Sequence, residues 1–91
     1  MSFDIRYHKL ALKEDIPRLS FEWRAKIKRA IEVRLATRPE VYGKPLRQSL
    51  GGYRKLRVGD YRVIFRIERA TVKIFIIRHR SVVYKMIQKR I

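Results

Sequence analysis

The chain has 91 residues, of which 46% are apolar, and this describes a single small domain (residues 1–91) with a core of its own. It has no cysteine, no apolar run near about 18 residues and no secretory signal pattern, which excludes a disulfide framework and a membrane span and predicts a cytoplasmic protein. The 24 Lys and Arg outnumber the 8 Asp and Glu, giving a formal charge of +16, which favours nucleic acid or a ribonucleoprotein as partner, and an acidic protein as a further one.

The first third of the chain predicts a strand and two helices. Residues 3–8 alternate between apolar and polar, with Phe3, Ile5 and Tyr7 facing inward. Residues 9–19 then carry Leu10, Leu12, Ile16 and Leu19 at helical spacing. Ser20 is a suitable N-cap for a longer amphipathic helix over residues 21–37, in which Trp23 is expected to anchor the core.

The rest of the chain predicts an antiparallel meander and a terminal helix. Residues 38–52 form a loop that holds at most one short turn, because two prolines and the Gly51-Gly52 pair interrupt it. Three strands follow at residues 53–58, 61–68 and 71–79, joined by turns at Gly59-Asp60 and Arg69-Ala70. Residues 82–91 form a short C-terminal helix. This order predicts an α+β two-layer sandwich, with two antiparallel helices on one face of the sheet and the other face open.

Basic residues gather on that open face. Strand alternation places Lys55, Arg57, Arg62 and Arg66 together on it if Val63 and Phe65 pack under the helices. A solvated face of a basic protein is the plain alternative. Arg78, His79 and Arg80 end the last strand, and Tyr84 follows at a distance from which it can fold back over the basic surface. A row of fixed cations can hold a phosphate backbone or stabilise a phosphodiester as it breaks.

The segments KPLRQSLGGYRKLRVGDYRVIFR and HRSVVY, with the strand–helix–helix order before them, resemble toxins of the RelE/ParE superfamily of type II toxin–antitoxin systems. The resemblance covers nearly the whole chain and implies the RelE-like fold. RelE-like members of this bacterial superfamily are mRNA interferases that cleave mRNA in the ribosomal A site, whereas ParE-like members inhibit DNA gyrase. We favour the RelE branch.

The resemblance also implies roles for particular residues. Lys55 and Arg57 match the basic positions of the second strand, and Arg62 matches the arginine after the hairpin turn. Arg80 or His79 matches the late basic position, and Tyr84 the late tyrosine. One position departs from the pattern, because Tyr53 stands where some RelE enzymes have a second lysine. Arg54 can replace that lysine only if a bulge turns it outward.

These residues suit metal-independent cleavage through a 2′,3′-cyclic phosphate, with no cofactor. Arg62 is a permanently charged phosphate clamp, and Lys55 and Arg57 strengthen the positive electrostatic field around the phosphate. His79 is a candidate acid or base. Tyr84 stacks on a base, orients the hydroxyl or closes the edge of the core. The assignment of general base and acid stays open between Lys55, His79, Arg80 and Tyr84. Two distant histidines (His8 and His79) without cysteine argue against a metal site.

The resemblance implies two kinds of partner. A cognate antitoxin, acidic in its toxin-binding segment, would cover the basic face or displace the terminal helix, and the free toxin would be a monomer. The ribosome and its mRNA would be the target, contacted through the basic surface that includes Lys9, Lys13, Arg24, Lys28 and Arg66. The rival hypotheses are a gyrase inhibitor and a non-enzymatic module that binds RNA or the ribosome.

Overall fold

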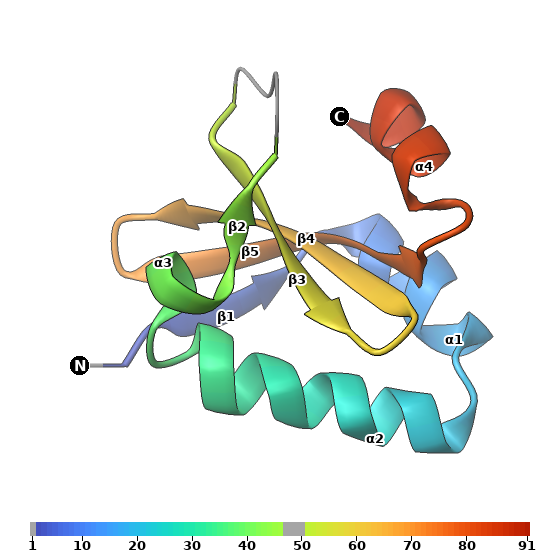
Figure 1. Ribbon diagram of the computed structural model, residues 1–91, viewed down its shortest axis with the longest axis horizontal. Helices are drawn as coiled ribbons and strands as arrows, with labels where there is room; N and C mark the ends of the chain where they lie inside the picture. Colours follow the sequence, from blue (N-terminus) through green and yellow to red (C-terminus); the bar gives the residue numbers. More distant parts are fainter. Residues whose placement is uncertain (1, 47–50) are drawn as a thin grey trace.

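Figure 1 shows a twisted sheet with a long helix along one face and a short C-terminal helix on the other. The structure is a computed structural model that describes residues 2–46 and 51–91. Five strands lie in the order β1-β5-β4-β3-β2, and all neighbouring pairs are antiparallel except β1 with β5. Their bounds are β1 Asp4–Tyr7, β2 Lys44–Pro45, β3 Tyr53–Val58, β4 Tyr61–Glu68 and β5 Thr71–His79. The α+β class and the predicted meander are confirmed.

The predicted helices are present, and each of the two long ones contains a wider π-helical turn. Residues 9–18 are helical and include η1 (Ala11–Asp15) and α1 (Ile16–Arg18). The long helix comprises α2 (Phe21–Ala30) and η2 (Ile31–Leu35), and the Ser20 hydroxyl caps it by accepting from the Trp23 N–H. Two short helices complete the chain, α3 (Pro39–Tyr42) and α4 (Val83–Arg90).

The π-helical turns change which side chains face the core. Burial recurs every four residues at Ala11 and Asp15 in the first helix and at Leu19, which caps its C-terminus. A π turn has an i→i+5 hydrogen bond, so it lengthens the repeat beyond the 3.6 residues that the prediction assumed. The prediction that Leu12 faces inward is therefore wrong, because its side chain is 51% exposed.

The predicted loop over residues 38–52 is only partly irregular. It contains α3, which is the short turn expected there, and the two-residue strand β2, which the sequence reasoning missed. Lys44 and Pro45 of β2 pair with Lys55 and Arg54. The Arg47-Gln48-Ser49-Leu50 part of the segment that carries the family resemblance lies outside the described residues.

Two apolar cores occupy the two faces of the sheet. The larger lies under α2 and includes Ile27, Ile31, Val63 and Phe65, with Phe3, Ile5, Tyr7 and Trp23 packed against it. The smaller lies under α4 and contains Ile64, Phe75, Ile76 and Val83. The face expected to be open is therefore partly covered, because α4 packs over its Ile64 and Ile76 region.

A β-bulge between β4 and β5 sets which residues of these strands lie opposite each other. From the Arg69-Ala70 turn, pairing is regular as far as Phe65 with Ile74. The next pair is Ile64 with Ile76, so Phe75 is the extra residue. Without this residue, Arg62 would face Ile77. With it, Arg62 faces Arg78, and this places a third arginine beside the hairpin.

Candidate phosphate-binding active site

Three arginines stand side by side across the middle of the sheet. Arg57 of β3 pairs with Arg62 of β4, and Arg62 pairs in turn with Arg78 of β5. Like charges that lie directly opposite on neighbouring strands destabilise a sheet. Arg78 is paired with a buried carboxylate, so the charges of this row that an anionic ligand would neutralise are those of Arg57 and Arg62. Arg78 was not among the site residues predicted from the sequence.

Arg62 is held by the hairpin turn that precedes it. Its Nη1 donates to the carbonyls of Gly59 and Tyr61, each at 2.9 Å. Gly59 has a φ of +57°, and the Trp23 ring lies where a Cβ would stand, so the turn requires glycine. A guanidinium has five donors, and among the described residues the Nε and Nη2 groups of Arg62 have no hydrogen-bond partner, so they can bind a phosphate.

Arg78 is held from the other side by a fully buried carboxylate. Its Nε donates to Asp15 Oδ1 at 2.7 Å. The same carboxylate accepts from the Ile77 N–H at 2.8 Å and from Arg90 Nη1 at 2.7 Å. Asp15 thus fixes Arg78 and also joins it to α4, which carries Arg90. Charged residues are rarely buried unless paired, and here two arginines provide the pairing.

Lys55 and Tyr84 complete this face from β3 and α4. Lys55 Nζ donates to Tyr84 Oη at 3.0 Å and lies 5.7 Å from the centroid of its ring. The expectation that Tyr84 folds back toward the basic surface is confirmed. Lys55 lies on the same face as Arg57, which is two residues further along β3, so the row and this pair adjoin one another.

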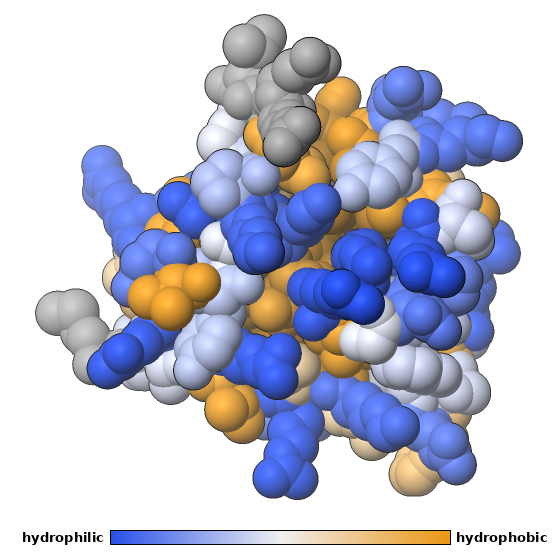
Figure 2. All heavy atoms as spheres, in the orientation of Figure 1, coloured by the Kyte–Doolittle hydropathy of each residue, from blue (hydrophilic) through white to orange (hydrophobic). Residues whose placement is uncertain are grey.

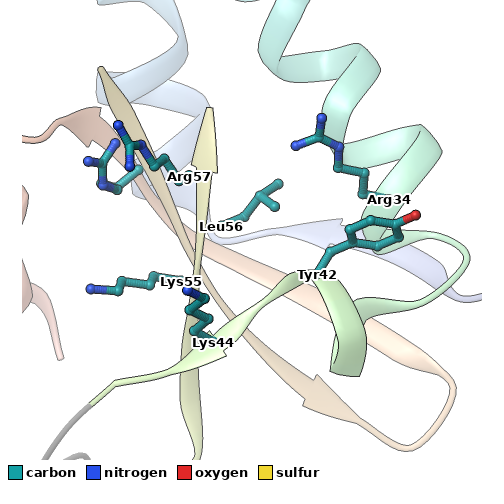
Figure 3. Close-up of a pocket in the computed structure, with 7 residues that line it drawn as sticks. Arg34, Tyr42, Lys44, Lys55, Leu56 and Arg57 are labelled. Carbon is teal, nitrogen blue, oxygen red and sulfur yellow. The ribbon is translucent and has the colours of Figure 1, made fainter. Parts of the chain in front are cut away.

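The cations gather around a shallow hollow at the edge of β3. Figure 2 shows hydrophilic side chains over the middle of this face, with apolar surface between them. The hollow has a volume of about 290 Å³. Its lining includes Arg57, Arg62 and the neighbouring pair Lys55 and Lys44, with Arg34 and Tyr42 on the far side of Leu56 (Figure 3). The geometry therefore provides a basic concavity rather than a flat charged surface.

Two of the predicted catalytic residues lie apart from this group. His79 pairs with Tyr61, whose ring packs against Trp23 on the α2 side of the sheet, and the His79 ring meets Tyr61 edge-on at 5.5 Å. Its Nδ1 shares a hydrogen bond of 2.9 Å with the Ser81 hydroxyl. Arg80 lies beside the hairpin turn, where its N–H donates to the Asp60 carbonyl and its Nε is 3.9 Å from the Asp60 carboxylate.

Tyr53 and Arg54 do not restore a second lysine-like group. Arg54 points away from the row, because its Nη1 donates to the Gly43 carbonyl at 2.9 Å. The bulge of this sheet lies between β4 and β5 and does not turn Arg54 outward. Arg66 shares the face of the row, but its guanidinium is bound by Glu68 and by Tyr53 Oη. The hydrogen bond to Glu68 is the main cause that raises the pKa of Arg66.

The other residues predicted to bind RNA or the ribosome lie on the helices. Arg24 and Lys28 are exposed on α2, on the opposite side of the sheet from the arginine row, where they border an apolar groove. Lys9 and Lys13 are exposed on the first helix. Among residues 2–46 and 51–91 no group of three or more His, Asp or Glu side chains is placed to hold a metal ion. In the same part of the chain no helix is long and apolar enough to cross a bilayer.

Comparison with known proteins places the chain in a family. Residues 5–84 match the family described as the ParE toxin of the type II toxin–antitoxin system parDE. The toxin–antitoxin complex RelBE2 from Mycobacterium tuberculosis contains a chain 30% identical to this one, with a TM-score of 0.80 over 89% of this chain and 94% of that one. The isolated Escherichia coli RelE toxin is 23% identical, with a TM-score of 0.65 over 98% of both chains.

A similar fold occurs in the RelB–RelE complex of Methanococcus jannaschii, which is 22% identical with a TM-score of 0.69 over 89% of this chain and 96% of that one. No curated protein shows significant similarity. The family match spans most of the chain, and the fold and the basic hairpin agree with it. The chain is therefore a toxin of the RelE/ParE superfamily of type II toxin–antitoxin systems.

Proposed function

We propose that this toxin is an endoribonuclease that cleaves mRNA in the ribosomal A site and so halts translation. The observation that carries the proposal is the row of Arg57, Arg62 and Arg78 in adjacent register, next to the Lys55–Tyr84 pair. Cations fixed on a sheet are preorganised, and preorganised charge stabilises an anionic transition state without the cost of reorienting water. The similarity to RelE structures supports the same reaction class.

The reaction would use the ribose 2′-hydroxyl as nucleophile. Its oxygen bonds to the adjacent phosphorus while the bond from phosphorus to the 5′-oxygen breaks, leaving a 2′,3′-cyclic phosphate and a 5′-hydroxyl. Arg62 would clamp the phosphate with its Nε and Nη2 donors, and Arg57 would stabilise the added negative charge. Arg78, which is paired with Asp15, would contribute less. The hydrogen-bonded Lys55 and Tyr84 form a short path that can take the 2′-proton or return one to the 5′-oxygen.

The partners follow from the same surfaces. The cognate antitoxin would place an acidic segment on the basic face between β3 and α4. Arg24 and Lys28 would contact ribosomal RNA from the α2 side of the sheet, and Lys9 and Lys13 would contact it from the first helix. Arg66 would extend the RNA surface beside the site. The free toxin would be a monomer.

Primer extension on an mRNA in a purified translation reaction tests the proposal. The wild-type protein is expected to produce breaks in the A-site codon only when ribosomes are present. Arg62→Ala is expected to reduce the cleavage rate by about 10²–10³, the usual loss for one donor to a developing anion.

Arg69→Gly provides the matched control for this experiment. It removes the same charge from a turn residue whose φ of 59° suits glycine. Arg69 lies seven residues beyond Arg62 along the chain, which is about 20 Å at the usual rise of a strand. Cleavage that disappears equally in both variants would contradict a role for Arg62 in the site.

A ParE-like inhibitor of DNA gyrase is the second candidate. The matching family is that of the ParE toxin, and Tyr53 stands where a second lysine is typical of some RelE enzymes. Intact mRNA together with DNA breaks that require gyrase would favour this candidate. Blocked translation with intact mRNA would instead indicate a non-enzymatic module that binds RNA or the ribosome.

A further inference from the structure

The hollow beside β3 extends beyond the residues that the cleavage chemistry uses. Five of its seven lining side chains are cations, and none is a carboxylate. Arg34 lies on the side opposite Arg57, and Lys44 lies beside Lys55 (Figure 3). In the part of the chain that the structure describes, neither Arg34 nor Lys44 forms an ion pair. Cations gathered in a concavity without counter-charge focus the field and attract anions.

Arg34 is preorganised by an aromatic ring. Its Cζ lies 5.8 Å from the centroid of Tyr42, within the range of a cation–π contact. Such a contact restricts a long side chain but occupies none of its N–H donors. Tyr42 is the last residue of α3, and Gly43 follows it with no room for a Cβ against the Phe65 ring. The Arg54 guanidinium donates to the Gly43 carbonyl, which ties this corner to β3.

Lys44 connects Arg34 to the arginine row. It pairs directly with Lys55 across β2 and β3, a further pair of like charges in register on this sheet. We propose that Arg34 and Lys44 form a second phosphate subsite, which binds a backbone phosphate of the RNA next to the one at Arg62. The inference rests on the proposed ribonuclease function and adds to it a path for the substrate, across the edge of β3.

Binding of a short single-stranded RNA at several salt concentrations tests the subsite. The probe is a tetranucleotide with 2′-O-methyl groups, which cannot be cleaved by its own ribose. For single strands, log Kobs falls with log[salt] by about 0.7 per phosphate contact. Removing the contact to this one phosphate in Arg34→Ala/Lys44→Ala is therefore expected to make the slope shallower by about 0.7.

The matched control removes two charges elsewhere. Arg6→Gln/Arg69→Gly changes an exposed residue of β1 and the β4–β5 turn, and it has the same net charge as the test variant. Its slope is expected to stay at the wild-type value. Equal slopes for the two double variants would overturn the subsite, because the effect would then come from net charge alone.

A neutral methylphosphonate linkage, moved along the probe, locates the contact. One position is expected to weaken binding to the wild-type protein and to have little effect in Arg34→Ala/Lys44→Ala. Equal losses in both proteins at every position would overturn the subsite. It would also be overturned if Arg34→Ala/Lys44→Ala bound RNA as the wild type does and lost affinity only for the antitoxin.

The two proposals can fail separately, because this readout does not involve cleavage. If no A-site cut appears but the salt slope of RNA binding is still shallower in Arg34→Ala/Lys44→Ala, the nuclease is overturned and the RNA subsite stands. If the A-site cut appears and is lost in Arg62→Ala, but the salt slope of RNA binding is unchanged in Arg34→Ala/Lys44→Ala, only the subsite is overturned.

Discussion

His8 shows how a single side chain depends on its protonation state in this fold. Its Nδ1 accepts the Leu10 N–H at 3.1 Å, so that nitrogen must be unprotonated where the first helix begins. Burial is the main cause that lowers the pKa of His8 below its ordinary value of 6.5, and the charges of Lys73, Arg90 and Lys9 lower it further. Asp15 acts in the opposite direction on the same pKa.

The lowered pKa predicts a loss of stability in mild acid. The unfolded chain takes up the proton at higher pH than the folded one, so the free energy of unfolding falls as pH falls below 6.5 and through the folded pKa. One group contributes at most about 1.4 kcal/mol per pH unit. In His8→Asn, which can still accept the Leu10 N–H, we expect a flatter profile in urea unfolding between pH 7.5 and 5. Parallel profiles for the two proteins would contradict a role for His8.

At the scale of elements, Asp15 connects three parts of the chain that are far apart in sequence. It lies on η1, and it binds the backbone of β5 at Ile77, the side chain of Arg78 and the side chain of Arg90 on α4. Removing one partner of a buried ion pair leaves an uncompensated charge, which is far more costly than losing an exposed pair. The position of α4 against the sheet therefore depends on one carboxylate.

Asp15→Asn is expected to lower the free energy of unfolding by about 3–5 kcal/mol. The neighbouring Glu14→Gln is the control, because Glu14 is 45% exposed and lies 3.9–4.0 Å from the same two arginines, which corresponds to at most about 1 kcal/mol. Urea denaturation of both variants measures the difference. A similar small loss in both would mean that Asp15 is no more important than a surface acid.

The strands and helices could largely be predicted from local pattern, whereas the cross-chain contacts could not. Alternation and turn residues were sufficient for β3, β4 and β5. The bulge at Phe75 has no signal in the sequence, and counting outward from the Arg69-Ala70 turn places Arg62 opposite Ile77. Arg78 was missed as a site residue because the resemblance assigned the late basic position to Arg80 or His79, and the register that brings Arg78 beside Arg62 could not be seen in the sequence.

Asp15 and β2 were missed for a different reason. A carboxylate between Glu14 and Ile16 in a helix is normally expected to face solvent, and its partner Arg90 lies 75 positions along the chain. β2 has only two residues, one of them a proline, so it carries no alternation. Once the bulge is included, His79 lies opposite Tyr61 and faces the same side of the sheet, which is the α2 side.

At the scale of the whole molecule, the charge of +16 acts within a body of 31 × 29 × 23 Å. Repulsion between so many cations destabilises the compact state, and the Debye length of about 10 Å at 0.1 M salt is short against these dimensions. The ion pairs around Asp15 are buried, so salt screens them much less than it screens the surface cations.

The fold should therefore be more stable at higher ionic strength. Between 20 and 300 mM NaCl we expect the free energy of unfolding to rise by on the order of 1 kcal/mol, because screening relieves the repulsion. Urea unfolding is the appropriate measurement, since urea adds no charge. A stability that decreases with salt would show that attractive surface pairs outweigh the repulsion.

The Asp15–Arg90 pair has a consequence for the edge of the sheet. β1 pairs with β5 only as far as Ile74, and beyond it the Ile77 N–H donates to Asp15 and the Phe75 carbonyl accepts from Arg90 at 3.0 Å. An unpaired strand edge is a template on which another chain can add a strand and aggregate. Here two of the backbone groups that a foreign strand would need, the Ile77 N–H and the Phe75 carbonyl, are already occupied by a carboxylate and a guanidinium. The contact that holds the C-terminal helix in place thus also shortens the free edge along which two copies of this chain could join their sheets.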